Sequence, residues 1–382
     1  MKQKIPLALY IHIPWCERKC PYCDFNSHEN YSPDIEPLYV SALLNDLDQQ
    51  LEFVDGRQVS SIFFGGGTPS LFSGPAIDQI LSGVRSKVLL TDDCEITLES
   101  NPGSAEAAKY RSYREAGVNR LSIGVQSFAE DKLRALGRIH TGDEARAAID
   151  MAFSSGFSRL NVDLMYGLEG QTQVEAISDI KTAMSYGISH LSWYQLTIER
   201  NTAFWSAPPT LPETDIIEPW QSKVSRLLGE FGIYQYEVSA WSKKGEESRH
   251  NLNYWLFGDY LAIGAGAHGK VTIGDSVYRL QRTRHPSHYL EEFEEAQANT
   301  GIKALKAIPD DDRVGEFMMN ALRLRNGAPR DYLQARTGKK FGAIKKTLES
   351  LSARGLISDD PERLVTTELG YRHLDSVIEA FF

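Results

Sequence analysis

The chain has 382 residues, with 41 Lys and Arg against 51 Asp and Glu, so its formal net charge is −10 at pH 7. This acidic balance excludes an overall basic field that would attract nucleic acid. The four cysteines are too few for a disulfide scaffold, and no stretch approaches the roughly 18 apolar residues of a membrane-spanning helix. We therefore expect a cytoplasmic protein without a nucleic-acid partner, folded as one large domain and a smaller one.

The first residues superficially imitate a signal peptide, because Lys2 and Lys4 precede an apolar run. His12 and Pro14 interrupt that run, and no small-residue cleavage site follows. We expect no signal peptide.

Short apolar runs alternate with longer amphipathic stretches over the first 200 residues. The strands are predicted at 7–13, 61–64, 95–99, 120–126, 160–165 and 191–197. The helices between them are predicted at 39–51, 76–84, 105–116, 130–136, 141–155 and 173–186. Strand–helix repeats of this kind form parallel strands with right-handed crossovers. Six units do not close an eight-stranded barrel, so residues 1–205 are predicted to form an open (β/α)6 partial TIM barrel.

The alternation of strand and helix patterns ends after residue 205. Residues 206–308 are predicted as a connector and a glycine-rich region, with prolines at 208, 209 and 212, a helix at 215–231 and glycines within 256–269. Residues 309–382 are predicted as a mainly helical, winged-helix-like domain, with helices at 311–324, 330–337 and 341–354 and a hairpin between 356 and 366. Because its basic and acidic residues nearly balance, we expect packing or partner docking rather than DNA binding.

Three cysteines, Cys16, Cys20 and Cys23, follow the first strand with the spacing C-x3-C-x2-C. Three thiolates can hold three irons of a [4Fe–4S] cube and leave the fourth iron without a protein ligand, whereas electron-transfer clusters usually use four cysteines. An open iron indicates chemistry at the cluster. The alternatives are a zinc site completed by His12 or His28, and three ordinary thiols.

Polar residues also follow the next strands. A Gly65-Gly66-Gly67-Thr68 loop follows the second strand, Glu99 ends the third, Gln126 ends the fourth and Asp163 lies late in the fifth. Parallel α/β barrels build their sites at the carboxyl ends of the strands, so these residues are expected at one mouth. The glycine loop lacks the G-K-[ST] of a phosphate loop and could be only a turn.

Four motifs carry a family resemblance: Y-I-H-I-P-W-C at 10–16, G-G-G-T-P at 65–69, R-L-S-I-G-V-Q-S-F at 120–128 and N-V-D-L-M at 161–165. With the cysteines, they resemble the radical S-adenosylmethionine (SAM) superfamily, in the branch that holds oxygen-independent coproporphyrinogen oxidases and haem chaperones. The resemblance runs over nearly the whole chain and implies the same partial barrel.

In that family SAM binds the open iron through its amino and carboxylate groups. The resemblance implies that the residues that contact this SAM are Tyr10, Gly66, Gly67, Thr68 and Glu99. It implies a second SAM held by Gln126, Arg138 and Asp163, with help from Tyr22, Gly67 and Thr68. The alternative for this second set is a polar network that lines the barrel, in which Arg138 and Asp163 form an ion pair.

The segment H-N-L-N-Y-W at 250–255 is the other candidate site. Tyr254 and Trp255 supply flat apolar surface for a porphyrin, and histidine is a common axial ligand of haem iron. The resemblance ties this motif to haem binding, through His250, Asn251, Tyr254 and Trp255. His268 is the second choice of ligand. Cys94 is predicted in an acidic loop before the third strand, as a packing residue.

The resemblance leaves two functions. One is a haem chaperone that carries the cluster and SAM and passes haem to an acceptor protein. The other is an oxygen-independent coproporphyrinogen III oxidase. The oxidase pattern has a further cysteine where this chain has Phe25, and a longer segment before the barrel, so we expect a chaperone without oxidase turnover. Radical cleavage of SAM stays open, as do a purely structural cluster, a monomer or a dimer, and peripheral membrane association through the acceptor.

Overall fold

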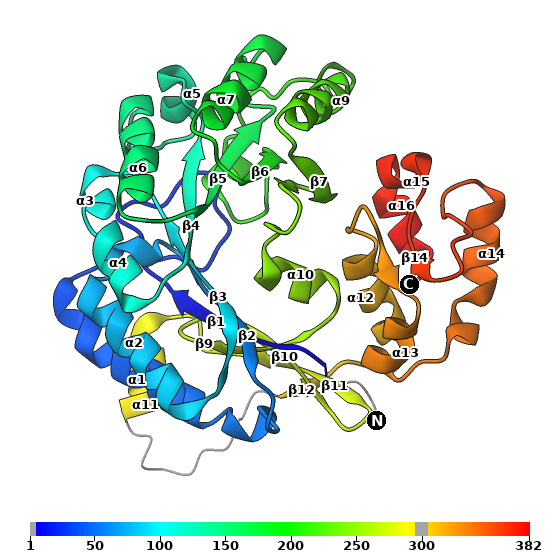
Figure 1. The fold of residues 1–382 in the computed structure, drawn as a ribbon, viewed down its shortest axis with the longest axis horizontal. Coiled ribbons are helices and arrows are strands. Elements are labelled where there is room, and N and C mark those ends of the chain that lie inside the picture. Colours follow the sequence, from blue (N-terminus) through cyan, green and yellow to red (C-terminus); the bar gives the residue numbers. More distant parts are fainter. Residues whose placement is uncertain (1–4, 295–304) are drawn as a thin grey trace.

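The computed structural model describes residues 5–294 and 305–382, and most strands belong to one continuous sheet (Figure 1). Its centre consists of six parallel strands in the order of the chain. They are β1 (Leu7–Ile13), β2 (Val59–Gly66), β3 (Leu90–Ser100), β4 (Arg120–Gln126), β5 (Arg159–Tyr166) and β6 (His190–Gln195). The predicted open barrel of six strand–helix units is confirmed.

Strand β1 shows how the sequence places side chains on the two faces of this sheet. Leu9, Ile11 and Ile13 are fully buried in the main apolar core. Tyr10 and His12 alternate with them and point into a cavity on the opposite face. Because side chains alternate along a strand, every second residue of the barrel strands faces the interior.

Helices follow the strands and cover the outer face of the barrel (Figure 1). Those at the predicted places are α1 (Glu36–Asp48), α2 (Gly74–Lys87), α3 (Ser104–Ala107), α4 (Tyr110–Ala116), α5 (Glu130–Ala135), α6 (Gly142–Ser154) and α7 (Gln173–Ser185). Thr141 and Thr172 are the N-cap residues of α6 and α7, and each forms a capping box. The single helix predicted at 105–116 is two helices, and at the break the Lys109 ammonium donates to the carbonyls of Ser70 and Leu71.

Cys94 is not in a loop. Strand β3 begins at Leu90, so Cys94 lies within the strand and is buried in the main core. The acidic residues Asp92 and Asp93 before it are exposed, and their polarity hid the start of the strand from the sequence pattern. The predicted packing role of Cys94 is confirmed.

The sheet continues beyond the six parallel strands on both sides. Beyond β1 lie β9 (Asp259–Ile263), parallel to β1, and the antiparallel strands β10 (His268–Ile273), β11 (Ser276–Gln281) and β12 (Lys306–Ala307). Beyond β6 lie β8 (Ala240–Ser242) and β7 (Tyr234–Glu237). The region predicted as a connector therefore extends the barrel sheet, and the end of the six parallel strands near residue 205 is not the end of the sheet. The division of the chain into three domains stays a prediction.

The helices of this middle region include one inside the barrel. α9 (Thr214–Glu230) and α11 (Pro286–Glu294) lie outside, whereas α10 (Arg249–Trp255) packs against β1 and β2 near the centre of the ribbon in Figure 1. The short α8 (Ala203–Ser206) lies against the cysteine loop, where the Phe204 N–H donates to the Pro21 carbonyl at 2.9 Å. The backbone N–H of His250 donates to the Glu95 carboxylate at 3.2 Å, and Glu95 is paired with Arg159 at 2.9 Å. These contacts fix α10 to the barrel strands.

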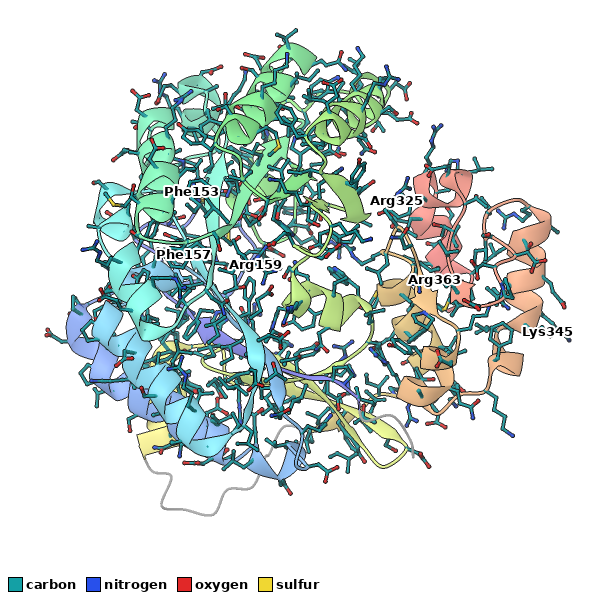
Figure 2. The ribbon with its side chains drawn as sticks, viewed as in Figure 1. Phe153, Phe157, Arg159, Arg325, Lys345 and Arg363 are labelled. Carbon is teal, nitrogen blue, oxygen red and sulfur yellow. The ribbon has the colours of Figure 1, made fainter. Side chains whose placement is uncertain are left out.

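The C-terminal segment is mainly helical, as predicted, and lies beside the barrel (Figure 1). Its helices are α12 (Asp312–Ala321), α13 (Asp331–Thr337), α14 (Lys345–Ala353), α15 (Glu368–Arg372) and α16 (Leu374–Glu379). The predicted hairpin is reduced to a bridge between Ile357 and Thr366, while β14 (Arg363–Leu364) pairs with β13 (Ala328–Pro329). Figure 2 labels Arg363, whose guanidinium donates to the carbonyls of Asn326 and Gly327 beside this pair.

The C-terminal segment has its own apolar core, which Phe257, from the turn between α10 and β9, and Val277 of β11 join. The segment is thus packed onto the side of the sheet that carries β9–β11. In residues 5–294 and 305–382, no helix has both the length and the apolar composition to cross a membrane.

Candidate functional site

The cysteine loop follows β1 directly and is closed at its base. Trp15 and His28 form a parallel bridge, and the N–H of Cys16 donates to the His28 carbonyl at 2.9 Å. Cys16, Cys20 and Cys23 are partly exposed and form no disulfide. The closed base holds the three thiols together at the mouth of the barrel.

The surroundings of the cysteines suit thiolates. Thr68 Oγ1 donates to Cys16 Sγ at 3.4 Å, and Arg138 Nη1 donates to Cys20 Sγ at 3.4 Å. Burial raises the pKa of the Cys16 and Cys23 thiols, so these groups need a cation to hold them deprotonated. Hydrogen bonds to sulfur and a nearby guanidinium are the environment expected of an iron–sulfur cluster. The donor set therefore fits a [4Fe–4S] cluster.

The zinc alternative finds no support in the side-chain positions. Among the described residues, no three His, Cys, Asp or Glu side chains are arranged to hold one metal ion. A cube binds each cysteine through a different iron, so its thiolates stand farther apart than the ligands of a single zinc ion. His12, one proposed fourth ligand, uses Nε2 to contact the Asn26 carbonyl at 2.8 Å.

Glu99 lies beside the glycine loop at the end of β3. It accepts a hydrogen bond from the Gly66 N–H and lines the cavity at the barrel mouth. Burial, with a smaller contribution from Asp163, raises the pKa of Glu99 to about 8. Because the Gly66 N–H offsets the cost of this charge only in part, a ligand that brings positive charge or a hydrogen-bond donor would stabilise the carboxylate.

The glycines at 66 and 67 are required by the protein itself. Gly66 has a φ of +116°, and a Cβ there would lie 2.6 Å from the His12 ring. A Cβ at Gly67 would lie 2.4 Å from the Trp15 carbonyl oxygen. A side chain at Gly66 would therefore first meet His12, which already fills that space.

The second predicted set lies around Tyr194, which is close to Tyr22, Gln126, Arg138 and Asp163. Arg138 Nη2 donates to Asn101 Oδ1 at 2.7 Å, beside its contact with Cys20. Asp163 accepts from Asn161 and Ser122. The ion pair between Arg138 and Asp163 that the alternative of a polar network included is therefore not formed, since each side chain has other partners.

The remaining members of that set lie near the cysteines. Tyr194 donates to Gln126 Oε1 at 2.7 Å, and Gln126 has a φ of +68°, which is rare for a residue other than glycine. Tyr22 packs against Phe204, and burial raises the pKa of its hydroxyl. Strained backbone at the end of a barrel strand is typical of a functional site.

His250 is buried and both of its ring nitrogens have partners. Nδ1 lies 3.0 Å from Ser61 Oγ, Nε2 lies 2.8 Å from the Tyr254 hydroxyl, and the ring stacks on Phe63. Burial lowers the pKa of His250 to about 3. The predicted haem ligand thus lies inside the barrel beneath Tyr254. The N–H of the neighbouring Asn251 donates to the Oγ of Ser248, which is the N-cap of α10.

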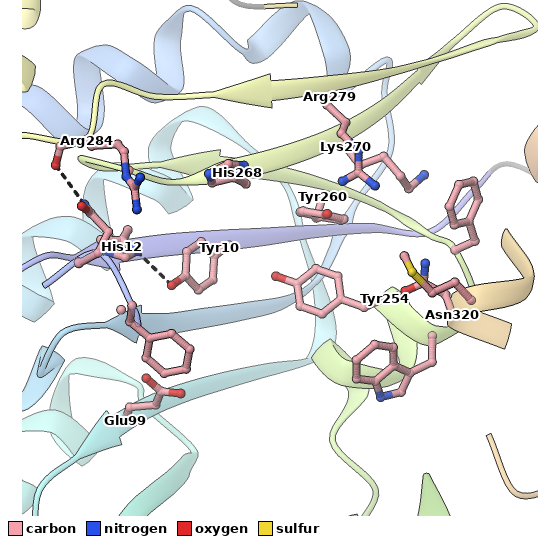
Figure 3. A pocket seen from close by; sticks show the side chains of 17 residues that line it. Tyr10, His12, Glu99, Tyr254, Tyr260, His268, Lys270, Arg279, Arg284 and Asn320 are labelled. Atoms are coloured by element: carbon pink, nitrogen blue, oxygen red, sulfur yellow. Dashed lines mark hydrogen bonds between the residues drawn. The ribbon is translucent and has the colours of Figure 1, made fainter. Parts of the chain in front are cut away.

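A cavity of about 520 Å³ joins part of the predicted SAM site to the aromatic residues of α10 (Figure 3). It contains Tyr10, Gly66 and Glu99 from the cluster side, and Tyr254 and Trp255 from α10. The cavity residues that sequence reasoning did not assign to a site are Phe25, Asn26, Phe257, Tyr260, Gly266, Lys270, Arg279, Arg284, Met319 and Asn320. For the residues of β9–β11, the sequence signal is the alternation of inward and outward side chains along each strand. These strands were not predicted, so their cavity residues were missed.

Sequence comparison places these features in a family. The radical SAM superfamily matches residues 10–183, and the HemN C-terminal domain matches residues 308–373. Proteins named heme chaperone HemW from Escherichia coli and Haemophilus influenzae are 47% and 44% identical to the chain, over 98% of it and 98% of each relative. The chain belongs to the HemW family of radical SAM proteins.

More distant relatives agree. A mouse protein named radical S-adenosyl methionine domain-containing protein 1, mitochondrial, is 33% identical over 97% of the chain and 86% of its own length. The solved structure of coproporphyrinogen III oxidase (HemN) from Escherichia coli aligns with 99% of the chain and 90% of its own length. The TM-score is 0.81 and the sequence identity is 23%. That likeness shows the shared fold, and family membership implies a [4Fe–4S] cluster and SAM.

Proposed function

We propose that this protein is a haem chaperone, which binds haem at the barrel mouth and passes it to an acceptor protein. The observation that carries the proposal is the match along nearly the full length to relatives that are named heme chaperone. The cavity supports it, because its aromatic side chains and its volume suit a flat apolar ligand.

In this proposal Cys16, Cys20 and Cys23 hold the cluster, and the open iron takes SAM. When bound, the cluster supplies one-electron reducing power to SAM. The residues proposed to contact this SAM are Tyr10, Gly66, Gly67, Thr68 and Glu99. Glu99 would accept a hydrogen bond from the ligand, and Gly66 and Gly67 would present their backbone to it, while their missing side chains leave room for His12 and Trp15 of the protein.

A second SAM is proposed beside the first, at Tyr22, Gln126, Arg138 and Asp163. The guanidinium of Arg138, already directed at Cys20, would balance the carboxylate of such a molecule. Equilibrium binding of radiolabelled SAM to the reconstituted protein tests this part. Two equivalents bound to wild type and one to Gln126→Ala support it, and one equivalent bound to wild type contradicts it.

Haem is proposed to lie against α10. Tyr254 and Trp255 face the cavity and would contact the porphyrin, with Asn251 and His250 behind them. His250 can reach haem iron only after the hydrogen bond from Nε2 to Tyr254 opens. His250→Ala tests this: a shifted or lost Soret band with intact cluster absorbance supports iron ligation, and an unchanged band contradicts it.

The alternative function, coproporphyrinogen III oxidation, is tested in the same preparation. Anaerobically reconstituted protein is given coproporphyrinogen III, SAM and a reductant, and a parallel sample is titrated with haem. We expect stoichiometric haem binding and no time-dependent protoporphyrinogen formation. Turnover of coproporphyrinogen III would overturn the chaperone proposal.

The proposed setting is the cytoplasm, where a reducing environment keeps the cysteines available for iron. The acceptor is proposed to be a haem protein. Any association of this chain with a membrane is proposed to be peripheral and to be made by binding to the acceptor. A monomer or a dimer is proposed, and sedimentation at two protein concentrations distinguishes them.

A further inference from the structure

The cavity at the barrel mouth has two unlike walls. One wall is aromatic and apolar, and its members are Tyr254, Trp255, Phe257 and Met319. The other wall carries nitrogen-containing side chains, which are His268, Lys270, Arg279 and Arg284. The chain as a whole is acidic, so this local gathering of cations is not a consequence of composition.

Strand register brings most of the basic wall together. In the β10–β11 hairpin, Lys270 stands opposite Arg279 and His268 stands opposite Gln281. Residues two apart on a strand share a face, and directly opposed residues on neighbouring strands share it too, so His268, Lys270 and Arg279 point to the same side. Figure 3 shows His268 between Arg279 on one side and Arg284 on the other.

The three cations differ in what already neutralises them. Lys270 is buried and its Nζ pairs with Asp259 Oδ1 at 2.9 Å, so its charge is used within the fold. Arg279 pairs with Glu316 at 2.5 Å, but its side chain is 40% exposed and its guanidinium has further donors.

Arg284 is the least neutralised of the three. Its side chain is exposed and forms no ion pair within residues 5–294 and 305–382. Its backbone carbonyl accepts a hydrogen bond from Asn26 Nδ2 at 2.9 Å, which fixes the residue beside the cysteine loop (Figure 3). The backbone of Arg284 is thus held in place while its guanidinium has no ion pair among the described residues, which suits an anionic ligand.

We propose that Arg284 and Arg279, with His268 between them, form a carboxylate-binding subsite that holds the propionates of the porphyrin while its ring lies against the Tyr254–Trp255 wall. The proposal rests on the haem-chaperone function and specifies how the ligand is oriented. Guanidinium groups bind carboxylates through paired, charge-assisted hydrogen bonds, which the opposite aromatic wall cannot supply. Arg284 contributes more than Arg279, because Arg279 shares its charge with Glu316.

The test compares haem with haem dimethyl ester, which keeps the ring and the iron but lacks the two negative charges. Both are titrated into the full-length reconstituted protein in the same detergent-containing buffer, for wild type, Arg284→Gln and Arg279→Gln. Arg226→Gln, an exposed charge loss on α9 outside the cavity, is the matched control. Cluster absorbance and circular dichroism verify that each variant is folded.

We expect Arg284→Gln to weaken haem binding about tenfold or more, which is the range of one lost charge-assisted contact. Arg279→Gln should cause a smaller loss, and the ester should bind both variants as it binds wild type. Equal losses for haem and ester, or unchanged haem affinity in both folded variants, would overturn the subsite while the chaperone function stands. Failure of wild type to bind either compound would overturn the chaperone function and the subsite together.

Discussion

The two sides of the cavity are assembled in different ways. The cluster side comes from consecutive strand ends, with the cysteines after β1, Gly66 at the end of β2 and Glu99 near the end of β3. The other side, where the porphyrin is proposed to lie and which we call the porphyrin side, comes from α10, the β9–β11 strands and α12. Parallel topology alone places the first side, whereas the second depends on register and on the packing of a helix inside the barrel.

The two sides also differ in how their buried polar groups are satisfied. On the cluster side Glu99 has a pKa of about 8, because burial is not offset by a neighbouring cation strong enough to hold the charge. On the other side His250 is neutral and has partners at both ring nitrogens. In the proposed function the first arrangement takes a ligand, whereas the hydrogen bonds of the second are complete within the protein.

The largest expected effect is on the cluster side. Cys16→Ser, Cys20→Ser and Cys23→Ser should each remove most iron and sulfide from the reconstituted protein, because each thiolate supplies charge and a bond to one iron. Iron and acid-labile sulfide analysis measures the loss. Cys94→Ser, buried in β3, is the control and should retain both. Equal loss from Cys94→Ser would refute the assignment.

Glu99→Gln should make the protein without SAM more stable, by an amount that depends on pH. The folded pKa of about 8 lies above the ordinary value of 4.5, so between these values the folded state holds more protons than the unfolded state. Stability of wild type therefore falls as pH rises from 4.5 to 8, by up to about 1.4 kcal/mol per pH unit from this group, and glutamine removes that dependence.

Urea unfolding at pH 5 and at pH 8.5 measures the effect. We expect a gain of several kcal/mol at pH 8.5 that largely disappears at pH 5. Glu115→Gln on the exposed face of α4 should show no such trend. A pH-independent difference between Glu99→Gln and wild type would show that Glu99 is not destabilised by burial. SAM affinity of the variant should fall, which separates a ligand contact from a structural acid.

The sequence predicted the cluster side well for a physical reason. Each barrel strand was recognised from its apolar run, and a polar residue at its end, such as Glu99 or Gln126, must lie at the mouth whatever the loops do. Boundaries were less accurate where a strand begins with exposed acidic residues, as at Asp92 and Asp93. These residues carry no apolar alternation, so the position of Cys94 was misjudged.

The porphyrin side could not be predicted to the same depth. The segment His250–Trp255 was singled out from the sequence, and Tyr254 and Trp255 do line the cavity, but the order of the residues in the sequence does not say which side chain faces it. α10 enters the barrel with His250 inward, against Ser61 and Phe63, and with Tyr254 and Trp255 along the cavity. Arg279 and Arg284 become cavity residues only through pairing across β10–β11 and through the contact with Asn26.

Tyr254→Phe probes the complete hydrogen-bond network on the porphyrin side. Without the hydroxyl, Nε2 of His250 is buried with no partner, which should lower the free energy of unfolding by about 1–3 kcal/mol. Tyr260→Phe removes a hydroxyl from the same cavity and should cost less, since its partner Arg279 keeps Glu316. Urea unfolding of both variants makes the comparison, and equal small losses would show that the His250–Tyr254 bond is not needed.

The smallest expected effect concerns the aromatic wall. The guanidinium of Arg323 lies 4.3 Å from the centre of the Trp255 ring, and indole is the aromatic group that attracts a cation most strongly. Trp255→Phe keeps a ring against the porphyrin but reduces contact area and the attraction of Arg323, so haem should bind about two- to fivefold more weakly.

The matched control for that variant is Trp205→Phe, because Trp205 is 54% exposed and lies outside the cavity. Haem and its dimethyl ester should lose the same factor in Trp255→Phe, since the ring contact does not involve the propionates. A loss confined to haem would assign a charge-dependent role to Trp255, acting through Arg323. An unchanged affinity for both compounds would move the porphyrin ring away from α10 and towards the apolar residues Phe257 and Met319 of the same wall.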